Sequence, residues 1–419
     1  MPEMNEVREA RIEIGQVCEP GDVAAHILLA VAGPQTTADV VTGRAASIPC
    51  LDEYVEGLRA AGYQDPLKAA GEALRRWHAR AEQLKPASSL REQMAEIGAH
   101  YLVPEDAAWP ARLLDLGLSQ PYGLWVRTGS RGAGTARDAR TALAACEVSL
   151  AVVGTREATQ YGLEITHRIA ARCRDTGVTV ISGGAIGIDG RAHASALERD
   201  AAAGRRGMST VAVLAGGIDR FYPASHHRLF EDILAGGALI SEATPGGAPT
   251  RWRFLQRNRL IAALSGAVVV VEARVRSGAL STANHALTIG RDVGAVPGNI
   301  TSELSAGCHA LLQTTASAVI AEPDDALRLL KRPDGSYIPE GIGPSPMPNA
   351  RGIARARVTD GMTEKQLAVY EATPVRRPVD VARIARWAGL SADEALGVLA
   401  DFDLRGYVRR AEGKWVRTR

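Results

Sequence analysis

Between Val148 and about Glu322, short runs of β-branched and apolar residues alternate with segments of helical character. The runs are VSLAVVG, VTVISGG, TVAVLAGG, ALISEA, AVVVVEA and DVGAVPG. Near-continuous apolar strands separated by helices are typical of a parallel sheet that helices cover on both faces. The pattern therefore predicts a doubly wound, Rossmann-like α/β domain. Ligands bind such sheets at the carboxyl ends of the strands.

The segments on either side of this region have a different character. At 419 residues the chain exceeds what one hydrophobic core usually organises, so we expect several domains. We predict a helical domain over 1–100, the α/β core over 101–330, a Pro/Gly-rich linker over 331–358 and a winged-helix-like domain of three helices and a hairpin over 359–419. Within the core, a short apolar strand pair precedes SRGAGTARDAR at 130–140, which we interpret as a surface loop.

The net charge of +2, from 49 Lys and Arg against 47 Asp and Glu, does not by itself indicate a nucleic-acid partner. The local charge does indicate such a partner, because residues 250–300 contain seven arginines and only two acidic residues, Glu272 and Asp292. The stretch RWRFLQRNR at 251–259 interleaves arginines with Trp252 and Phe254. Proteins that bind single-stranded nucleic acid combine arginines, which contact phosphates, with aromatic rings, which stack on bases. The alternative is that these arginines form salt bridges within the fold.

Three Gly-rich turns follow predicted strands and open predicted helices, where backbone N–H groups and the helix dipole favour a phosphate. The candidate binding residues are Gly154, Thr155, Arg156, Ser182, Gly183, Gly184, Gly187, Ser277, Gly278 and Thr282. Tight strand–helix turns without a ligand are the alternative. None of the turns is the G-x-G-x-x-G fingerprint, and no acidic residue ends the second strand to hold a ribose. We therefore disfavour NAD and expect no cofactor.

Signals for catalysis are weak. Asp189 and His193 lie one helical turn apart, so they are candidates for a proton-transfer couple. The favoured alternative is a helix-start aspartate beside a hydrogen-bonded histidine. Glu272 is a candidate general base or a residue that orients an arginine. No G-x-S-x-G elbow or Ser–His–acid set can be assembled, and the adjacent pair His226 and His227 cannot share one helix face. We expect no catalytic residues and no metal site.

The first residues, MPEMNEVREARIEIGQ, are acidic and lack an apolar signal region. No uncharged apolar run approaches the roughly 20 residues needed to cross a bilayer. The five cysteines are scattered, without a C-x-x-C pair, so we expect reduced, structural thiols. The sequence predicts a cytoplasmic protein that does not contact a membrane.

Seven ordered motifs closely resemble the DNA-processing protein DprA (Smf) family. They are VVGTREATQYG, SGGAIGIDGRAHASAL, TVAVLAGGIDRFYP, ALISEATPGG, FLQRNRLIAALSGAVVVVEARVRSGALSTANHAL, GRDVGAVPGN and SAGCHALL. The resemblance implies an extended Rossmann fold, an N-terminal domain of the SAM or helix-hairpin-helix type, and a homodimer. It also implies a protein that binds and protects incoming single-stranded DNA and loads the RecA recombinase during natural transformation, rather than an enzyme.

By the same resemblance, Arg257, Asn258 and Arg259 join the Gly-rich turns in a basic DNA-binding pocket. The sequence departs from the family pattern at Leu255, where proline is usual, and at His309 and Thr315, where asparagine and glycine are usual. The alternative function is a Rossmann-type nucleotide phosphoribohydrolase with Glu272 or Asp189 as the acid–base group. Its P-G-G-x-G-T-x-x-E signature is absent here.

Overall fold

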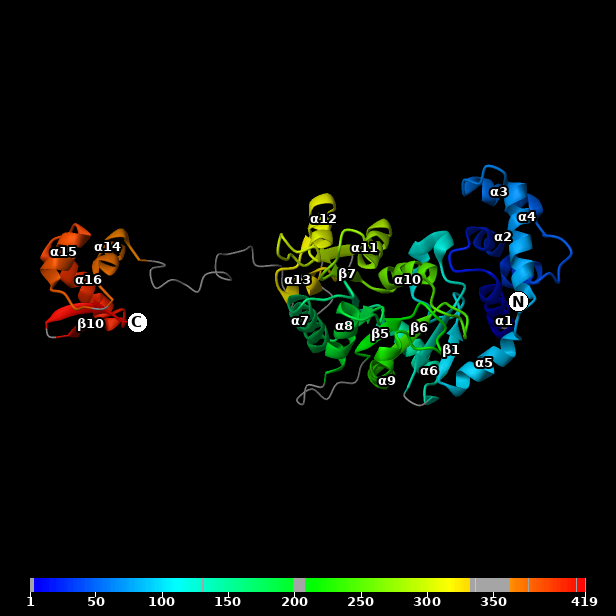
Figure 1. Cartoon of the computed structure of the whole chain (residues 1–419), viewed down its shortest axis with the longest axis horizontal. Helices are drawn as coiled ribbons and strands as arrows, with labels where there is room; N and C mark the ends of the chain where they lie inside the picture. The colour runs from blue at the N-terminus through cyan, green and yellow to red at the C-terminus, as the bar shows by residue number, and fades with distance from the viewer. Residues whose placement is uncertain are drawn as a thin grey trace. The chain divides into compact units, whose positions relative to one another are not determined.

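The computed structural model describes residues 4–129, 132–198, 208–331, 336, 362–375, 377–411 and 413–418. The chain forms two compact units, Met1–Pro344 and Ser345–Arg419 (Figure 1). The predicted linker at 331–358 lies outside the described residues except for Lys331 and Ser336. In the described part of the chain, no helix is both long enough and apolar enough to cross a membrane.

Residues 4–98 are helical, as predicted. The helices are α1 (Met4–Val17), α2 (Val23–Val41), α3 (Leu51–Ala60), α4 (Pro66–Ala81) and α5 (Ala87–Glu96). Helix α2 is interrupted at Gly33, whose φ of 76° is not helical. Ile12 of α1 and Leu90 of α5 share a buried cluster with Trp125 of the sheet. The helical region is therefore packed onto the α/β core within one unit.

The larger unit holds a nine-stranded sheet in the order β1-β2-β6-β5-β4-β3-β7-β8-β9. The strands are β1 (Ala99–Leu102), β2 (Leu124–Thr128), β3 (Ser149–Val153), β4 (Thr179–Ser182), β5 (Thr210–Val213), β6 (Gly237–Ser241), β7 (Ala267–Val270), β8 (Asp292–Ala295) and β9 (Ala318–Val319). All six predicted runs are strands and pair in parallel, which confirms the α/β fold class. The predicted strand pair, β1 and β2, extends the sheet in antiparallel fashion beside β6.

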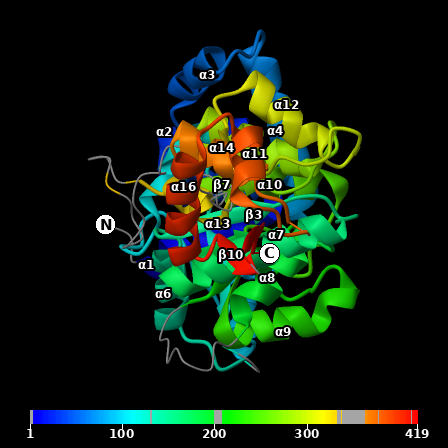
Figure 2. The same ribbon diagram turned by 90° about the vertical axis from the view of Figure 1, so that its left-hand side faces the viewer.

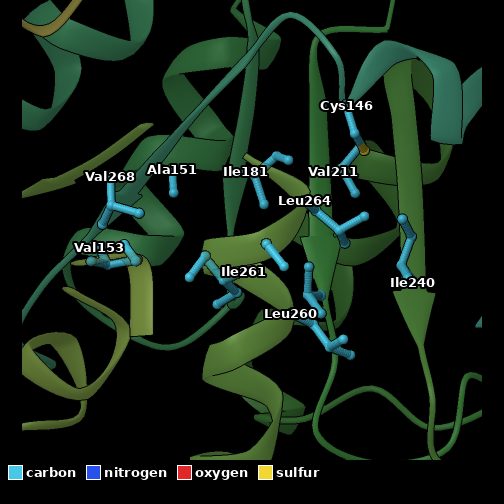
Figure 3. Close-up of a cluster of buried hydrophobic side chains, with 14 of the residues drawn as sticks. Cys146, Ala151, Val153, Ile181, Val211, Ile240, Leu260, Ile261, Leu264 and Val268 are labelled. Atoms are coloured by element: carbon cyan, nitrogen blue, oxygen red, sulfur yellow. The ribbon is translucent and has the colours of Figure 1, made fainter. Parts of the chain in front are cut away.

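Helices cover both faces of the sheet (Figures 1 and 2). The covering helices are α6 (Ala136–Ala145), α10 (Arg251–Leu264), α11 (Gly278–Thr288) and α12 (Ala306–Thr314) on one face, and α7 (Gln160–Thr176), α8 (Ile188–Leu197), α9 (His227–Gly236) and α13 (Pro323–Arg328) on the other. Successive strand residues point to opposite faces, so Ala151 packs toward α10 and Val152 toward α8. The α10 side chains Leu260, Ile261 and Leu264 lie against the strands (Figure 3).

Only part of the predicted loop at 130–140 is a loop. Residues 136–140 form the first half of α6, and residues 130 and 131 lie outside the described residues. Thr135 and Asp138 form a capping box that satisfies N–H groups at the helix start. The prediction was wrong here because glycines and charged residues masked this N-terminal helix signal.

The smaller unit contains three helices and a hairpin. They are α14 (Glu364–Ala372), α15 (Val381–Ala388), α16 (Ala392–Leu404), β10 (Val408–Ala411) and β11 (Lys414–Arg417). Ser391 is the N-cap of α16. Val369, Leu399, Phe402 and Trp415 belong to a separate core. Assignment of this unit to the winged-helix class, like the four-part division into domains, stays a prediction.

The packing of α10 leads to a test of stability. Replacing the fully buried Leu260 by alanine should lower the free energy of unfolding by about 2–5 kcal/mol, because the change removes apolar contacts and leaves a cavity. Urea titration of the full chain measures the loss. Leu255→Ala, on the same helix but 42% exposed, is the matched control and should cost much less. Equal losses for the two variants would contradict the packing described.

Candidate nucleic-acid interface

An open cavity of about 1210 Å³ lies where the strand order of the sheet reverses. Strand β3 has the parallel neighbours β4 and β7, which belong to the two halves of the doubly wound sheet. Residues just after β3, β4 and β7 line the cavity, namely Gly154, Ala185 and Ser277. The cavity therefore occupies the carboxyl ends of the strands at the topological switch point, the usual ligand site of such sheets.

The loop after β3 is held by backbone hydrogen bonds on two sides. Thr155 N donates to Glu272 O at 2.7 Å, and Ile188 N donates to Thr155 O at 3.2 Å. A Cβ on Gly154 would approach Glu272 O and Ile188, so only glycine allows the loop to come this close. Arg156 follows directly, lines the cavity and is exposed to solvent.

Three consecutive residues of α10 point in three directions, because successive helical residues are rotated by about 100°. Arg257 lines the cavity and its Nη1 donates to Val213 O at 3.3 Å. Asn258 also lines it, and its Nδ2 donates to Gly278 O at 3.1 Å, which ties α10 to the start of α11.

Arg259 does not line the cavity. Its guanidinium forms a bidentate pair with Glu242, at 2.6 and 2.7 Å, and its Nε donates to Ser119 O at 2.9 Å. Both side chains are largely buried. Arg253 likewise pairs with Glu19 of the N-terminal helical region. Arg253 and Arg259 therefore form salt bridges within the fold, which was the alternative to nucleic-acid binding for the arginines of 251–259.

The Gly-rich segment after β4 lies behind the cavity and shapes it. A Cβ on Gly183 would overlap the Arg257 guanidinium, and one on Gly184 would meet Phe230. Gly187 has a φ of 86°, and a Cβ there would meet the carbonyls of the Arg156 loop. Neither these glycines nor the buried Ser182, whose hydroxyl donates to Val152 O, line the cavity. Gly183 gives room to Arg257, Gly187 to the Arg156 loop and Gly184 to Phe230.

The N-terminus of α11 faces the cavity. Ser277 is its N-cap and accepts a hydrogen bond from Leu280 N at 3.4 Å. Ser277, Gly278 and Thr282 all line the cavity. The Thr282 hydroxyl donates to Gly278 O, so it contributes to the helix itself. The first N–H groups of the helix and its dipole give this wall a positive potential.

Aromatic rings form part of the cavity wall. Two guanidinium groups lie near the Phe254 ring, with the Arg156 Cζ 5.2 Å and the Arg257 Cζ 5.9 Å from its centre. The Tyr222 ring lies 5.6 Å from Phe254 and is 49% exposed. Both aromatic residues line the cavity. The exposed Tyr222 ring and the partly exposed Phe254 ring, beside guanidinium groups, are suited to stacking with nucleic-acid bases.

The charge of the lining is strongly positive. Five arginines line the cavity, Arg156, Arg251, Arg257, Arg274 and Arg276, against the acids Glu157 and Asp189. Arg274 is paired with Glu157 and Glu303. In the part of the chain that the structure describes, Arg156, Arg251 and Arg276 form no ion pair. These three cations are therefore available to an anionic ligand.

Asp189 and His193 do not form a proton-transfer couple. Asp189 accepts a hydrogen bond from Gly183 N at 3.2 Å, and His193 Nδ1 bonds Thr210 Oγ1 at 2.7 Å. Burial raises the pKa of Asp189, while the nearby Arg257 opposes this shift. Burial lowers the pKa of His193 to about 3, so its imidazole is neutral at neutral pH. The favoured alternative, two residues bonded within the fold, matches this geometry.

Glu272 has neither of the two roles considered for it. Its carboxylate accepts from Thr159 N at 2.9 Å and from Thr159 Oγ1 at 2.5 Å. Thr159 is the N-cap of α7, and Gly162 in the first turn leaves space for the carboxylate. Glu272 is buried, does not line the cavity and fixes the start of α7 beside β7.

The structure thus brings eight of the predicted binding residues to one cavity. They are Gly154, Thr155, Arg156, Arg257, Asn258, Ser277, Gly278 and Thr282. Sequence reasoning did not include Tyr222, Arg274 or Arg276 among the binding residues, although the local excess of arginine pointed to the last two. Leu255, at the position of the usual proline, lines the cavity, and His309 bonds Gly298 outside it. Among the described residues, no cluster of His, Cys, Asp and Glu could hold a metal ion.

Comparison with known proteins decides the family. The model of the family described as DNA recombination-mediator protein A matches residues 100–331. The putative DNA processing protein DprA of Mycobacterium tuberculosis H37Rv is 39% identical over 335 residues, which cover 77% of this chain and 78% of that protein. The chain belongs to the DprA (Smf) family.

Other members agree with this assignment. Protein Smf of Escherichia coli K12 is 35% identical over 64% of this chain and 68% of that protein. The crystal structure of DprA from Streptococcus pneumoniae aligns with a TM-score of 0.54 at 23% identity and covers 78% of this chain and 98% of that chain. The structural alignment supports the fold, and the sequence matches assign this chain to a family of DNA recombination mediators.

The structural role of the buried pair between Arg259 and Glu242 can be tested. Arg259→Ala should lower the free energy of unfolding by about 3–5 kcal/mol, because it leaves the Glu242 carboxylate buried and unpaired. Urea titration measures the loss, and the double variant Arg259→Ala/Glu242→Ala should lose less than the sum of the single changes. Arg59→Ala, which breaks an exposed pair with Glu56, is the control and should cost under about 1 kcal/mol. A similar cost for Arg259→Ala would contradict the structural role.

Proposed function

We propose that this DprA-family chain binds single-stranded DNA in the cavity at the switch point of its sheet. The observation that carries the proposal is the lining itself, in which three unpaired arginines, a helix N-terminus and two aromatic rings meet in one open cavity. Arginines and the N-terminus of α11 contact phosphates, and Phe254 and Tyr222 stack on bases.

The lining favours a nucleic-acid strand over a small cofactor. The cationic side chains come from the loop after β3, from α10 and from the loop after β7, so they are spread around the cavity rather than focused on one phosphate. Of the two residues considered as acid–base group of a nucleotide hydrolase, Glu272 is bonded to Thr159 and absent from the lining. Asp189 lines the cavity, but it is buried and its carboxylate accepts from Gly183 N. A non-catalytic binding role is therefore the better-supported one.

Membership of a recombination-mediator family supports a wider role. We infer that the protein protects single-stranded DNA in the cytoplasm and, as a homodimer, delivers it to the RecA recombinase during natural transformation. Coating by many sequence-tolerant contacts suits this role, because incoming strands have no common sequence.

The binding site is tested by removing one exposed arginine. Arg156→Ala should weaken binding of labelled oligothymidylate and oligodeoxyadenylate alike, and should reduce the slope of log affinity against log salt by about 0.7. Fluorescence anisotropy over a sodium chloride series measures both quantities. Arg59→Ala on α3 removes the same charge far from the cavity in sequence and should change neither. Binding that does not depend on salt, or an unchanged slope for Arg156→Ala, would exclude the cavity as the site.

The RecA role has a separate readout. The protein should shorten the lag before RecA filaments form on strands that are already coated by a single-strand-binding protein. Arg156→Ala should lengthen the lag again, since delivery requires the DNA to be held. Filament formation followed by ATP hydrolysis measures the lag. If the wild-type protein binds the DNA yet leaves the lag unchanged, the mediator role is wrong although the binding site stands.

A further inference from the structure

The smaller unit separates its charges between two surfaces. Helix α16 carries the acids Asp393, Glu394, Asp401 and Asp403. Glu394 is paired with Lys365, and Asp401 with Arg405. In the described part of the unit, exposed arginines without an acidic partner lie on α15 and on the hairpin, and include Arg383, Arg386, Arg409 and Arg410, whereas the exposed Arg405 at the C-cap of α16 is paired with Asp401. Helix α16 is therefore mainly acidic, with two of its acids paired to cations of the same unit, whereas α15 and β10 carry arginines.

The outer face of α15 combines positive charge with an aromatic ring. The helix buries Ile384 and Ala385, so its periodicity places Arg383, Arg386 and Trp387 on the opposite side. All three are exposed, and Trp387 is 58% exposed. The Arg383 Cζ lies 5.5 Å from the centre of the indole ring. A largely exposed indole, with the Arg383 guanidinium over its ring, thus lies on the same helix face as Arg386.

These cations have no carboxylate partners in the described part of the unit. The nearest acid in sequence, Asp380, is the N-cap of α15, where its carboxylate accepts from Arg383 N at 2.8 Å. The hairpin is joined to the start of α15, because Val379 and Trp415 exchange two backbone hydrogen bonds at 2.8 and 3.0 Å. The basic strand β10 pairs with β11 and so belongs to the same small sheet.

We propose that the α15 face, defined by Arg383, Arg386 and Trp387, is a second binding site for single-stranded nucleic acid. Trp387 stacks on an unpaired base and the two arginines contact the adjacent phosphates. Because α16 is acidic, it does not lie against the phosphates. This site lies on a different unit from the cavity, and so goes beyond the function proposed above.

The test uses the full chain with the cavity weakened. In the background Arg156→Ala/Arg276→Ala, both changes being at exposed residues, binding of labelled oligothymidylate should remain measurable by anisotropy at low salt. Adding Trp387→Ala should weaken that residual binding about fivefold or more, whereas Trp387→Phe, which keeps a stacking ring, should retain most of it. Adding Arg386→Gln should reduce the salt slope by about 0.7.

Arg405→Gln is the control, because it removes one positive charge from the same unit at the C-cap of α16, where Arg405 is paired with Asp401. It should leave the residual binding unchanged, and a thermal melt of each variant checks that the fold is retained. Residual binding that is insensitive to both Trp387→Ala and Arg386→Gln would overturn the proposal. Equal or tighter binding of a duplex of the same length, lost with the same changes, would overturn the single-strand assignment. If the cavity changes alone have no effect while Trp387→Ala weakens binding, the cavity proposal fails and this one stands.

Discussion

The burial of α10 against the sheet is the contact on which the rest of the larger unit depends. Every residue from Arg257 to Leu264 is buried, and Leu260, Ile261 and Leu264 fill one face of the sheet (Figure 3). Because the helix is fixed by this apolar contact, the polar residues of its buried turn are fixed as well. Arg257 is directed to the ends of β4 and β5, Asn258 to the start of α11, and Arg259 to Glu242.

The loops at the switch point are held in place by groups that do not line the cavity. Glu272 joins the end of β7 to the start of α7 through Thr159, and its carbonyl holds Thr155. Gly183 has no side chain and so leaves room for the buried Arg257 guanidinium. A basic cavity needs such support, because cations that repel each other keep a defined geometry only where the backbone around them is bonded.

The near-neutral net charge conceals a spatial separation of charge. Some arginines of the 251–259 stretch neutralise acids inside the fold, as Arg253 does with Glu19 and Arg259 with Glu242. Others, such as Arg251, remain free at the cavity. A count of charged residues cannot distinguish the two groups, because solvent exposure and pairing decide which charges act on a ligand.

The sequence by itself determined the strands, the parallel α/β class, the helical N-terminal region and the positions of the Gly-rich turns, because strand and helix periodicity and turn chemistry are local. It also indicated a basic binding surface near 251–259. Only the tertiary structure decided that Arg156 and Arg257 share one cavity with Phe254, that Arg259 belongs to a buried ion pair, and that the 183–187 glycines support the site. These outcomes depend on which face of a helix meets which strand, and that is fixed by packing between segments far apart in the chain. The capping box of Thr135 and Asp138 is different, because it is a local signal that the sequence already contained. It was missed because the surrounding residues are rich in glycine.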